Sequence, residues 1–141
     1  MANSTVRKDQ AISQAYNASA NAADYDNNGF ARQLALVARL IKGQLGTKLY
    51  MVTLDGFDTH AGQNNIHPNL LHILSKGLRA FYEDLAVGNF AKDVLSMTFS
   101  EFGRRIEQNA SGGSDHGAAA PLLLFGEGLN GNGFVGDNPD L

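Results

Sequence analysis

The sequence predicts an α/β domain in which a mainly parallel sheet is flanked by helices. Two amphipathic helical segments alternate with short apolar segments, and this alternation is typical of parallel sheets. The first short segment, 48–54, is mostly apolar on both faces, so we expect helices to cover both sides of the sheet. Polar loops follow these segments, and ligands of parallel sheets collect at the carboxyl ends of the strands.

Residues 1–27 are rich in Ala, Asn, Ser and Asp, and they predict a polar leader or a connecting helix over about 8–23. Residues 28–141 are expected to form one α/β domain. The length of 141 residues is sufficient for one domain with a modest core.

Two apolar stripes with steps of three and four residues predict buried helix faces. Asp26 or Asn27 is expected to cap the first helix, which Gly46 would end, and Pro68 to lie in the first turn of the second. The stripes consist of Phe30, Leu34, Val37, Ile41 and Leu45, and of Leu70, Leu74, Leu78, Phe81 and Leu85.

Three segments, 48–54, 93–99 and 121–125, have the short, apolar composition of strands. The first two should deliver the loops that follow them to one edge of a parallel sheet. A long polar loop is expected between the second and third strands.

The composition excludes several classes of protein. The net charge of −3 gives no reason to expect nucleic acid or an anionic membrane as a partner. The chain has no cysteine, which excludes disulfides and thiolate ligands. No apolar run is long enough to span a membrane, and Met1-Ala2-Asn3-Ser4 does not begin a recognisable signal peptide.

Two pairs of acid and histidine residues are the candidate metal ligands: Asp58 with His60, and Asp115 with His116. Carboxylate and imidazole together suit zinc, manganese or iron. In an extended loop Asp58 and His60 point the same way and could bind one ion, whereas Asp115 and His116 point apart and could serve two. This arrangement favours a binuclear hydrolytic site. Alternatively, Asp58 forms a turn and the histidines are hydrogen-bonded loop residues.

Polar residues between these pairs are further candidates. Glu101 could be a ligand, a partner that orients an imidazole or a charge at a helix N-terminus, and Ser100 is interpreted as a helix cap rather than a nucleophile. Arg104 and the adjacent Arg105 could bind an anionic substrate or simply be exposed. Asn109 could face the site from the long loop. Three further residues are interpreted as non-ligands: Asp55, His67 and His72.

The motifs resemble those of the bacterial domain-of-unknown-function family numbered 1501. The resemblance covers about residues 30–141 and rests on Gly56-Phe57-Asp58-Thr59-His60, Ser100-Glu101-Phe102-Gly103-Arg104, Asn109, Asp115-His116-Gly117 and the glycine-rich residues 131–136. That family looks like a branch of the alkaline phosphatase and sulfatase superfamily.

The resemblance implies an α/β/α sandwich with a binuclear metal site that hydrolyses phosphate or sulfate esters. By resemblance, Asp58, His60, Asp115 and His116 are metal ligands, and the cofactor is a divalent metal, zinc first and manganese, calcium or iron as alternatives. The family also implies a periplasmic or secreted protein. Residues 1–47 lack a strand that ends in Asp and a nucleophile, and no histidine follows His116, so we expect a domain truncated at both ends. The alternative is a non-catalytic scaffold of this fold that binds a glycan or a protein.

Overall fold

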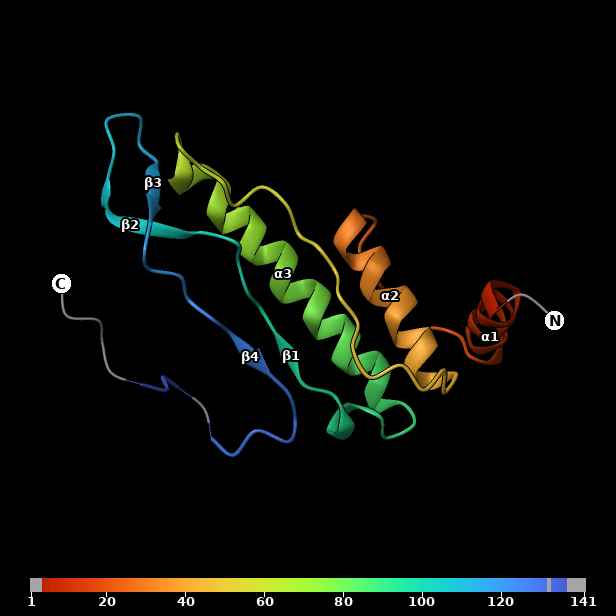
Figure 1. Cartoon of the computed structure of the whole chain (residues 1–141). Coiled ribbons are helices and arrows are strands. Elements are labelled where there is room, and N and C mark those ends of the chain that lie inside the picture. The colour runs from red at the N-terminus through yellow and green to blue at the C-terminus, as the bar shows by residue number, and fades with distance from the viewer. Residues whose placement is uncertain (1–3, 132, 137–141) are drawn as a thin grey trace.

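The computed structural model describes residues 4–131 and 133–136, which form three α-helices and two small antiparallel sheets (Figure 1). The predicted parallel sheet and the α/β/α sandwich are therefore wrong for the described part of the chain. Position 132 of the glycine-rich motif and residues 137–141 lie outside the described residues. The elements are α1 (Ser4–Ala18), α2 (Gly29–Lys42), α3 (Gln63–Ala86), the short 3-10 helix η1 (Ala91–Asp93), β1 (Ser96–Met97), β2 (Gly103–Gln108), β3 (Ser114–Gly117) and β4 (Leu124–Phe125).

Helix α2 occupies the place that its apolar stripe predicts, but its ends differ. Asn28 is the N-cap, because its side-chain oxygen accepts a hydrogen bond from Ala31 N at 2.8 Å. The helix ends at Lys42, with Gly43 as its C-cap, and not at Gly46. Helix α1 lies within residues 1–27, but it begins and ends earlier than the helix predicted over about 8–23.

Helix α3 begins five residues before Pro68, so this proline lies inside the helix and not in its first turn. Its buried face packs on α2, and Gly77 allows a close approach, since a Cβ there would lie 2.9 Å from Phe30 Cε1. The shared core consists of Phe30, Leu34, Ala38, Phe81, Leu85 and Ala91. Of the helices in the described residues, none is long and apolar enough to cross a membrane.

The first predicted strand, 48–54, is extended but is not part of a sheet. Val52 and Leu54 pack on the helical core, whereas Met51 on the other face is 77% exposed. The side chain of Gln33 replaces a strand partner. Its amide accepts from Thr53 N and donates to Thr53 O, each at 3.0 Å. A side chain of α2 thus satisfies a peptide group that the sequence assigned to a parallel ladder.

The second and third predicted strands are reduced to two residues each, and they pair antiparallel as β1 and β4. The Tyr82 hydroxyl of α3 lies 2.7 Å from Phe125 O and 2.9 Å from Ser96 Oγ, which holds the pair against the helix. The outer face remains open, since Met97 is 57% and Phe99 69% exposed.

The predicted long polar loop is instead a hairpin of β2 and β3, which lies beside the N-terminal end of α3 (Figure 1). Arg104 pairs with His116, and Gly103 pairs with Gly117. A Cβ at Gly103 would lie 2.5 Å from Gly117 O, so the close approach of the strands requires glycine. Asp115 and His116 therefore belong to a strand and not to a loop that precedes one.

A buried carboxylate fastens the segment after α1 to the helical core. Asp84 on α3 is fully buried and forms an ion pair with Lys42 on α2. It also accepts hydrogen bonds from Asn21 Nδ2 at 2.7 Å, from Ala22 N at 2.7 Å and from the Tyr25 hydroxyl at 3.0 Å. Burial alone would raise the pKa of Asp84, but its hydrogen bonds, with Lys42 foremost, hold the pKa below the ordinary value.

Candidate metal site

The two acid–histidine pairs of the sequence lie together at the N-terminal end of α3. The chain before α3 runs beside the turn of the β2–β3 hairpin, where Ala61 and Gly112 form an isolated β-bridge. Ser114 N donates to Thr59 O at 3.2 Å, which joins the two segments next to the candidate ligands. A hairpin therefore produces the convergence that the sequence attributed to the edge of a parallel sheet.

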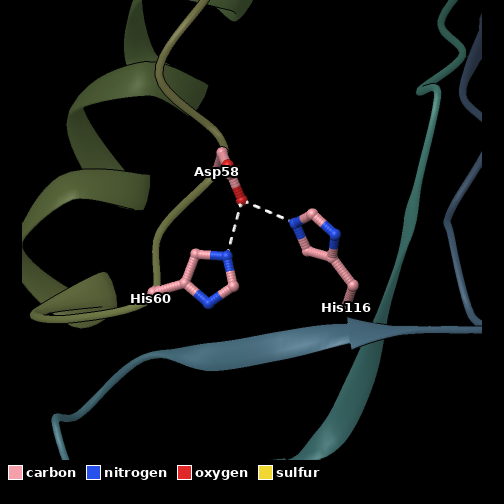
Figure 2. Close-up of side chains that lie close together, drawn as sticks. All are labelled: Asp58, His60 and His116. Atoms are coloured by element: carbon pink, nitrogen blue, oxygen red, sulfur yellow. Dashed lines mark hydrogen bonds and ion pairs between the residues drawn. The ribbon is translucent and has the colours of Figure 1, made fainter.

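Asp58, His60 and His116 form the centre of the site (Figure 2). Asp58 Oδ1 lies 3.1 Å from His60 Nε2 and 2.8 Å from His116 Nε2. One ligand atom from each residue lies within 4.8 Å of the other two, which is close enough for all three to bind one ion. The side chains are 55%, 51% and 50% exposed in chain order, so solutes can reach them.

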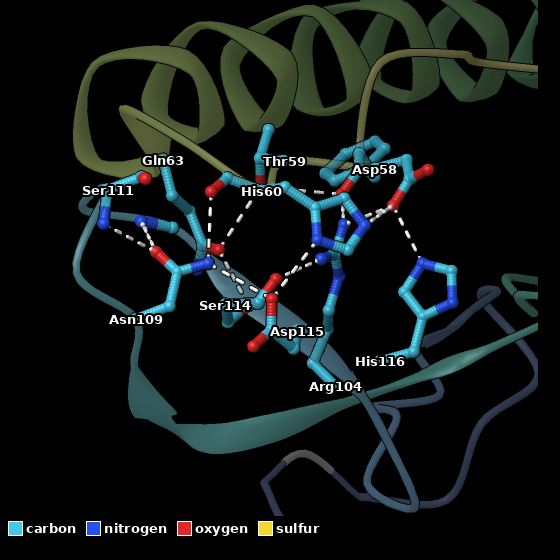
Figure 3. A network of polar contacts seen from close by, with 12 residues as sticks. Asp58, Thr59, His60, Gln63, Arg104, Asn109, Ser111, Ser114, Asp115 and His116 are labelled. Carbon is cyan, nitrogen blue, oxygen red and sulfur yellow. Dashed lines mark hydrogen bonds and ion pairs between the residues drawn. The ribbon is translucent and has the colours of Figure 1, made fainter.

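Asp115 lies on the opposite side of the His60 ring, with its Oδ1 3.2 Å from His60 Nδ1 (Figure 3). The imidazole therefore lies between two carboxylates. A carboxylate can only accept hydrogen bonds, and a neutral imidazole has one N–H. If the Nδ1 of a neutral His60 donates to Asp115, the lone pair of Nε2 faces Asp58 Oδ1, and either a proton on Nε2 or a metal cation between the two atoms would remove the repulsion. The donor set therefore fits a bound cation.

Asn109 organises the turn that supports this pair. Its Nδ2 donates to His60 O at 3.0 Å and to Asp115 Oδ1 at 3.1 Å. Its Oδ1 accepts from the backbone N–H groups of Ser111 and Gly113, each at 3.0 Å. Asn109 thus faces the site, as the sequence suggests, but from the hairpin turn.

Both carboxylates of the site are held in the ionised form. A hydrogen bond from His116 lowers the pKa of Asp58 below its ordinary value, and the charges of His60 and Arg104 lower it further. For Asp115, the hydrogen bond from Asn109 is the main cause of a lowered pKa, followed by the hydrogen bond from His60. Ionised carboxylates are the form that binds metals.

A layer of buried polar groups lies beneath the candidate ligands. Ser114 Oγ donates to Gln63 Oε1 at 2.8 Å, and Thr59 Oγ1 lies 3.1 Å from the same oxygen. Thr59 Oγ1 also lies 2.9 Å from His67 Nε2. Thr59 and Ser114 are only 4% and 5% exposed, so their hydroxyls support the loops and are not accessible nucleophiles.

Sequence reasoning did not identify Gln63 as part of this layer, and it placed His67 outside the site. His67 contacts Thr59. Among the described residues, no hydrogen bond joins His67 to Asp58, His60 or His116. Helix α3 begins at Gln63, which places Gln63 and His67 one turn apart, and both side chains contact Thr59. The sequence pattern placed the start of this helix later and therefore did not reveal these contacts.

The motif around Ser100 has a different structure from the predicted one. A strand and not a helix follows it, so the interpretation of Ser100 as a helix cap is wrong. Ser100 Oγ accepts a long hydrogen bond of 3.4 Å from Phe102 N. Glu101 is exposed, and no hydrogen bond among the described residues joins it to the three central side chains. Arg104, by contrast, lies against Asp58, with its Nη2 2.8 Å from Asp58 Oδ1.

Comparison with known proteins places the chain in a family. A family model described as "Protein of unknown function (DUF1501)" matches residues 2–141, so the chain belongs to the DUF1501 family, as its motifs predict. No curated protein and no solved structure matches.

Proposed function

We propose that this DUF1501 chain binds a divalent metal ion through Asp58, His60 and His116, and that the site serves the hydrolysis of phosphate or sulfate esters. The observation that supports the proposal is the convergence of three ligand atoms within 4.8 Å from segments more than 50 residues apart in sequence. In this proposal Asp115 orients His60 by accepting its Nδ1–H. Such a carboxylate–histidine–metal arrangement is common in protein metal sites.

The donor set favours a particular group of metals. Two imidazole nitrogens and one carboxylate oxygen suit zinc, iron or manganese better than calcium, which prefers oxygen ligands. Three protein ligands are typical of catalytic zinc sites, which keep a further position open for substrate. We therefore propose zinc as the resident metal. The half-exposed side chains are consistent with access for a small ester.

The roles of the protein groups follow from their contacts. A bound divalent metal would supply a Lewis acid for a phosphoryl or sulfuryl oxygen. Asp115 and Asn109 would hold His60 in one tautomer and orientation, and Asp58 would contribute the negative charge that draws the metal. The motifs suggest hydrolysis of phosphate or sulfate esters and export to the periplasm, although the described residues do not form the α/β/α sandwich of the alkaline phosphatase and sulfatase superfamily.

The metal proposal is tested by elemental analysis and by zinc titration of the purified chain. We expect about one equivalent of zinc in the wild type and a loss of at least tenfold in affinity for His116→Ala and Asp58→Ala. His72→Ala is the matched control, because His72 is an exposed histidine of α3 outside the site. Absence of metal from the wild type, or an equal loss in the control, would refute the proposal.

A second candidate function is a non-catalytic scaffold that binds a glycan or a protein. The observation in its favour is that Thr59 and Ser114, the hydroxyl residues adjacent in sequence to the candidate ligands, are buried. Hydrolysis of nitrophenyl phosphate and nitrophenyl sulfate by the zinc-loaded chain separates the two functions. Turnover that disappears in His116→Ala supports the hydrolase, whereas metal binding without turnover supports the scaffold.

A further inference from the structure

Metal ligation does not explain the Phe102-Gly103-Arg104 motif, although its residues contact the site. We propose that Phe102 and Arg104 are positioning residues, which fix His116 and Asp58 in the orientation that binds the metal. This inference rests on the proposed metal site. It assigns Arg104 a role other than binding the substrate.

Arg104 joins both segments that carry the candidate ligands. Its Nη2 donates to Phe57 O at 2.7 Å and to Asp58 Oδ1 at 2.8 Å, and its Nη1 donates to Ser114 O. The side chain is only 17% exposed. A planar guanidinium can make these contacts at once, whereas an ammonium group has no such rigid fork. Because both terminal nitrogens are engaged by the protein, Arg104 is poorly placed to bind an ester.

Phe102 holds the other side of the site. Its ring stacks on the His116 imidazole, with 4.3 Å between the ring centroids and 8° between the planes. The Arg104 guanidinium lies 5.1 Å from the centroid of the same phenylalanine ring. Stacking leaves the edge of the imidazole free and restricts its rotation, which directs Nε2 of His116 toward Asp58.

The backbone explains why these two residues act together. Phe102 directly precedes β2, and its ring centroid lies 5.1 Å from the Arg104 guanidinium, so the two side chains lie on the same side of the chain. Arg104 is also the strand partner of His116. Gly103 has no Cβ to separate the strands, which brings Phe102 and Arg104 close to β3. Phe102 and Arg104 can therefore hold the side chains of the metal ligands in place. Gly103 lies between these two larger residues because a Cβ there would separate the strands.

Charge and geometry make opposite predictions for Arg104. If Arg104 acted only through its positive charge, its removal would strengthen the binding of a cation, and Lys would replace Arg without effect. If Arg104 acts by orienting Asp58, both Arg104→Met and Arg104→Lys weaken binding. The sign of the change in the Arg104→Met variant therefore distinguishes the two roles.

The first test measures binding of Co²⁺ by visible absorption, since the spectrum reports the coordination geometry. We expect Arg104→Met and Phe102→Leu to bind Co²⁺ about 10–100-fold more weakly than the wild type and with an altered spectrum. Arg104→Lys should weaken binding in the same direction. The matched controls are Arg79→Met and Phe99→Leu, which alter exposed residues. An unchanged spectrum with equal or tighter binding in Arg104→Met or Phe102→Leu would overturn the inference.

The second test uses the metal-free chain and records the ring-proton resonances of His116 by NMR. The stacked phenylalanine should shift these resonances, and Phe102→Leu should abolish the shift while Phe99→Leu retains it. If the resonances do not change in Phe102→Leu, the positioning contact is absent and the inference fails. If the shift is lost as expected but the wild type binds neither Co²⁺ nor Zn²⁺, the contact stands and the proposed function fails.

Discussion

Replacing Asp84 by Asn tests whether the buried ion pair holds the N-terminal segment on the helical core. The exposed fractions of the Lys42 and Asp84 side chains are 7% and 0%. The substitution leaves the Lys42 ammonium without a counter-charge, and the new amide N–H₂ faces groups that already donate. Removing one partner of a buried ion pair costs about 3–5 kcal/mol.

The lower part of this range applies here, because Lys42 Nζ also donates to Ala20 O and so retains one partner. We expect Asp84→Asn to lower the free energy of unfolding by about 3 kcal/mol, which is a large fraction of the roughly 5–15 kcal/mol of a typical domain. Urea denaturation followed by far-UV circular dichroism measures this change. The double variant Lys42→Met/Asp84→Asn should recover part of the loss, since no unpaired charge remains.

Glu83→Gln is the matched control, because Glu83 is the adjacent acidic residue and its ion pair with Arg79 is exposed. Its effect should remain within roughly 0.5 kcal/mol. A loss of less than about 1 kcal/mol in Asp84→Asn would refute the assigned role of the buried pair.

The same carboxylate predicts how stability depends on pH. The pKa of Asp84 in the folded chain lies below its ordinary value of 3.8. Its contribution is therefore fully present above the unfolded pKa and is lost as the pH falls through the lower folded pKa. Acid titration of the free energy of unfolding should show this loss in the wild type, and Asp84→Asn should lack that part of the dependence.

Three further substitutions test local packing and helix capping. Gly113→Ala would place a Cβ 2.3 Å from the backbone carbon of His60, so zinc affinity should fall by at least about tenfold in a titration. Gly77→Ala would bring a Cβ within 2.9 Å of Phe30, and overpacking of about 1–3 kcal/mol should exceed the gain in helix propensity and lower the thermal midpoint. Asn28→Ala removes the cap of α2 and should cost about 1 kcal/mol in urea denaturation.

Each substitution has a control. Gly128→Ala introduces a Cβ with only an ordinary contact of 3.7 Å, and Gly29→Ala meets nothing within 4 Å. Neither should reduce stability, and Gly128→Ala should leave zinc affinity unchanged. Asn28→Asp keeps a capping oxygen and should retain most of the lost stability. Equal effects in a substitution and its control would show that the contact in question is not responsible.

The sequence predicted the helices of the core because their apolar residues recur with helical spacing. It could not predict that the segment 48–54 would remain outside a sheet. Half-buried and exposed residues alternate in this segment, as they do in a strand. The hydrogen-bonding groups of the Thr53 backbone instead pair with the side chain of Gln33, which is distant in sequence. Local pattern does not reveal a partner that comes from a helix side chain.

The candidate site was predictable in its residues and not in its geometry. Asp58, His60, Asp115 and His116 do lie together, but we predicted their orientations from an extended chain for each pair separately. The structure places Asp115 behind His60 and not beside His116, because the hairpin and Asn109 decide which ring each carboxylate faces. Such a choice depends on contacts between segments that are far apart in the chain.

Helix α3 connects the two ends of the molecule that these experiments probe. Its 24 residues span about 36 Å, with Gln63 beneath the candidate metal ligands at one end and Asp84 in the buried ion pair at the other. A helix that unfolds as one cooperative unit transmits stabilisation along its length. Metal binding should therefore slow amide hydrogen exchange near Asp84, although no ligand approaches it. Slower amide exchange in the last turns of α3 would therefore report whether a metal ion is bound beside its first turn.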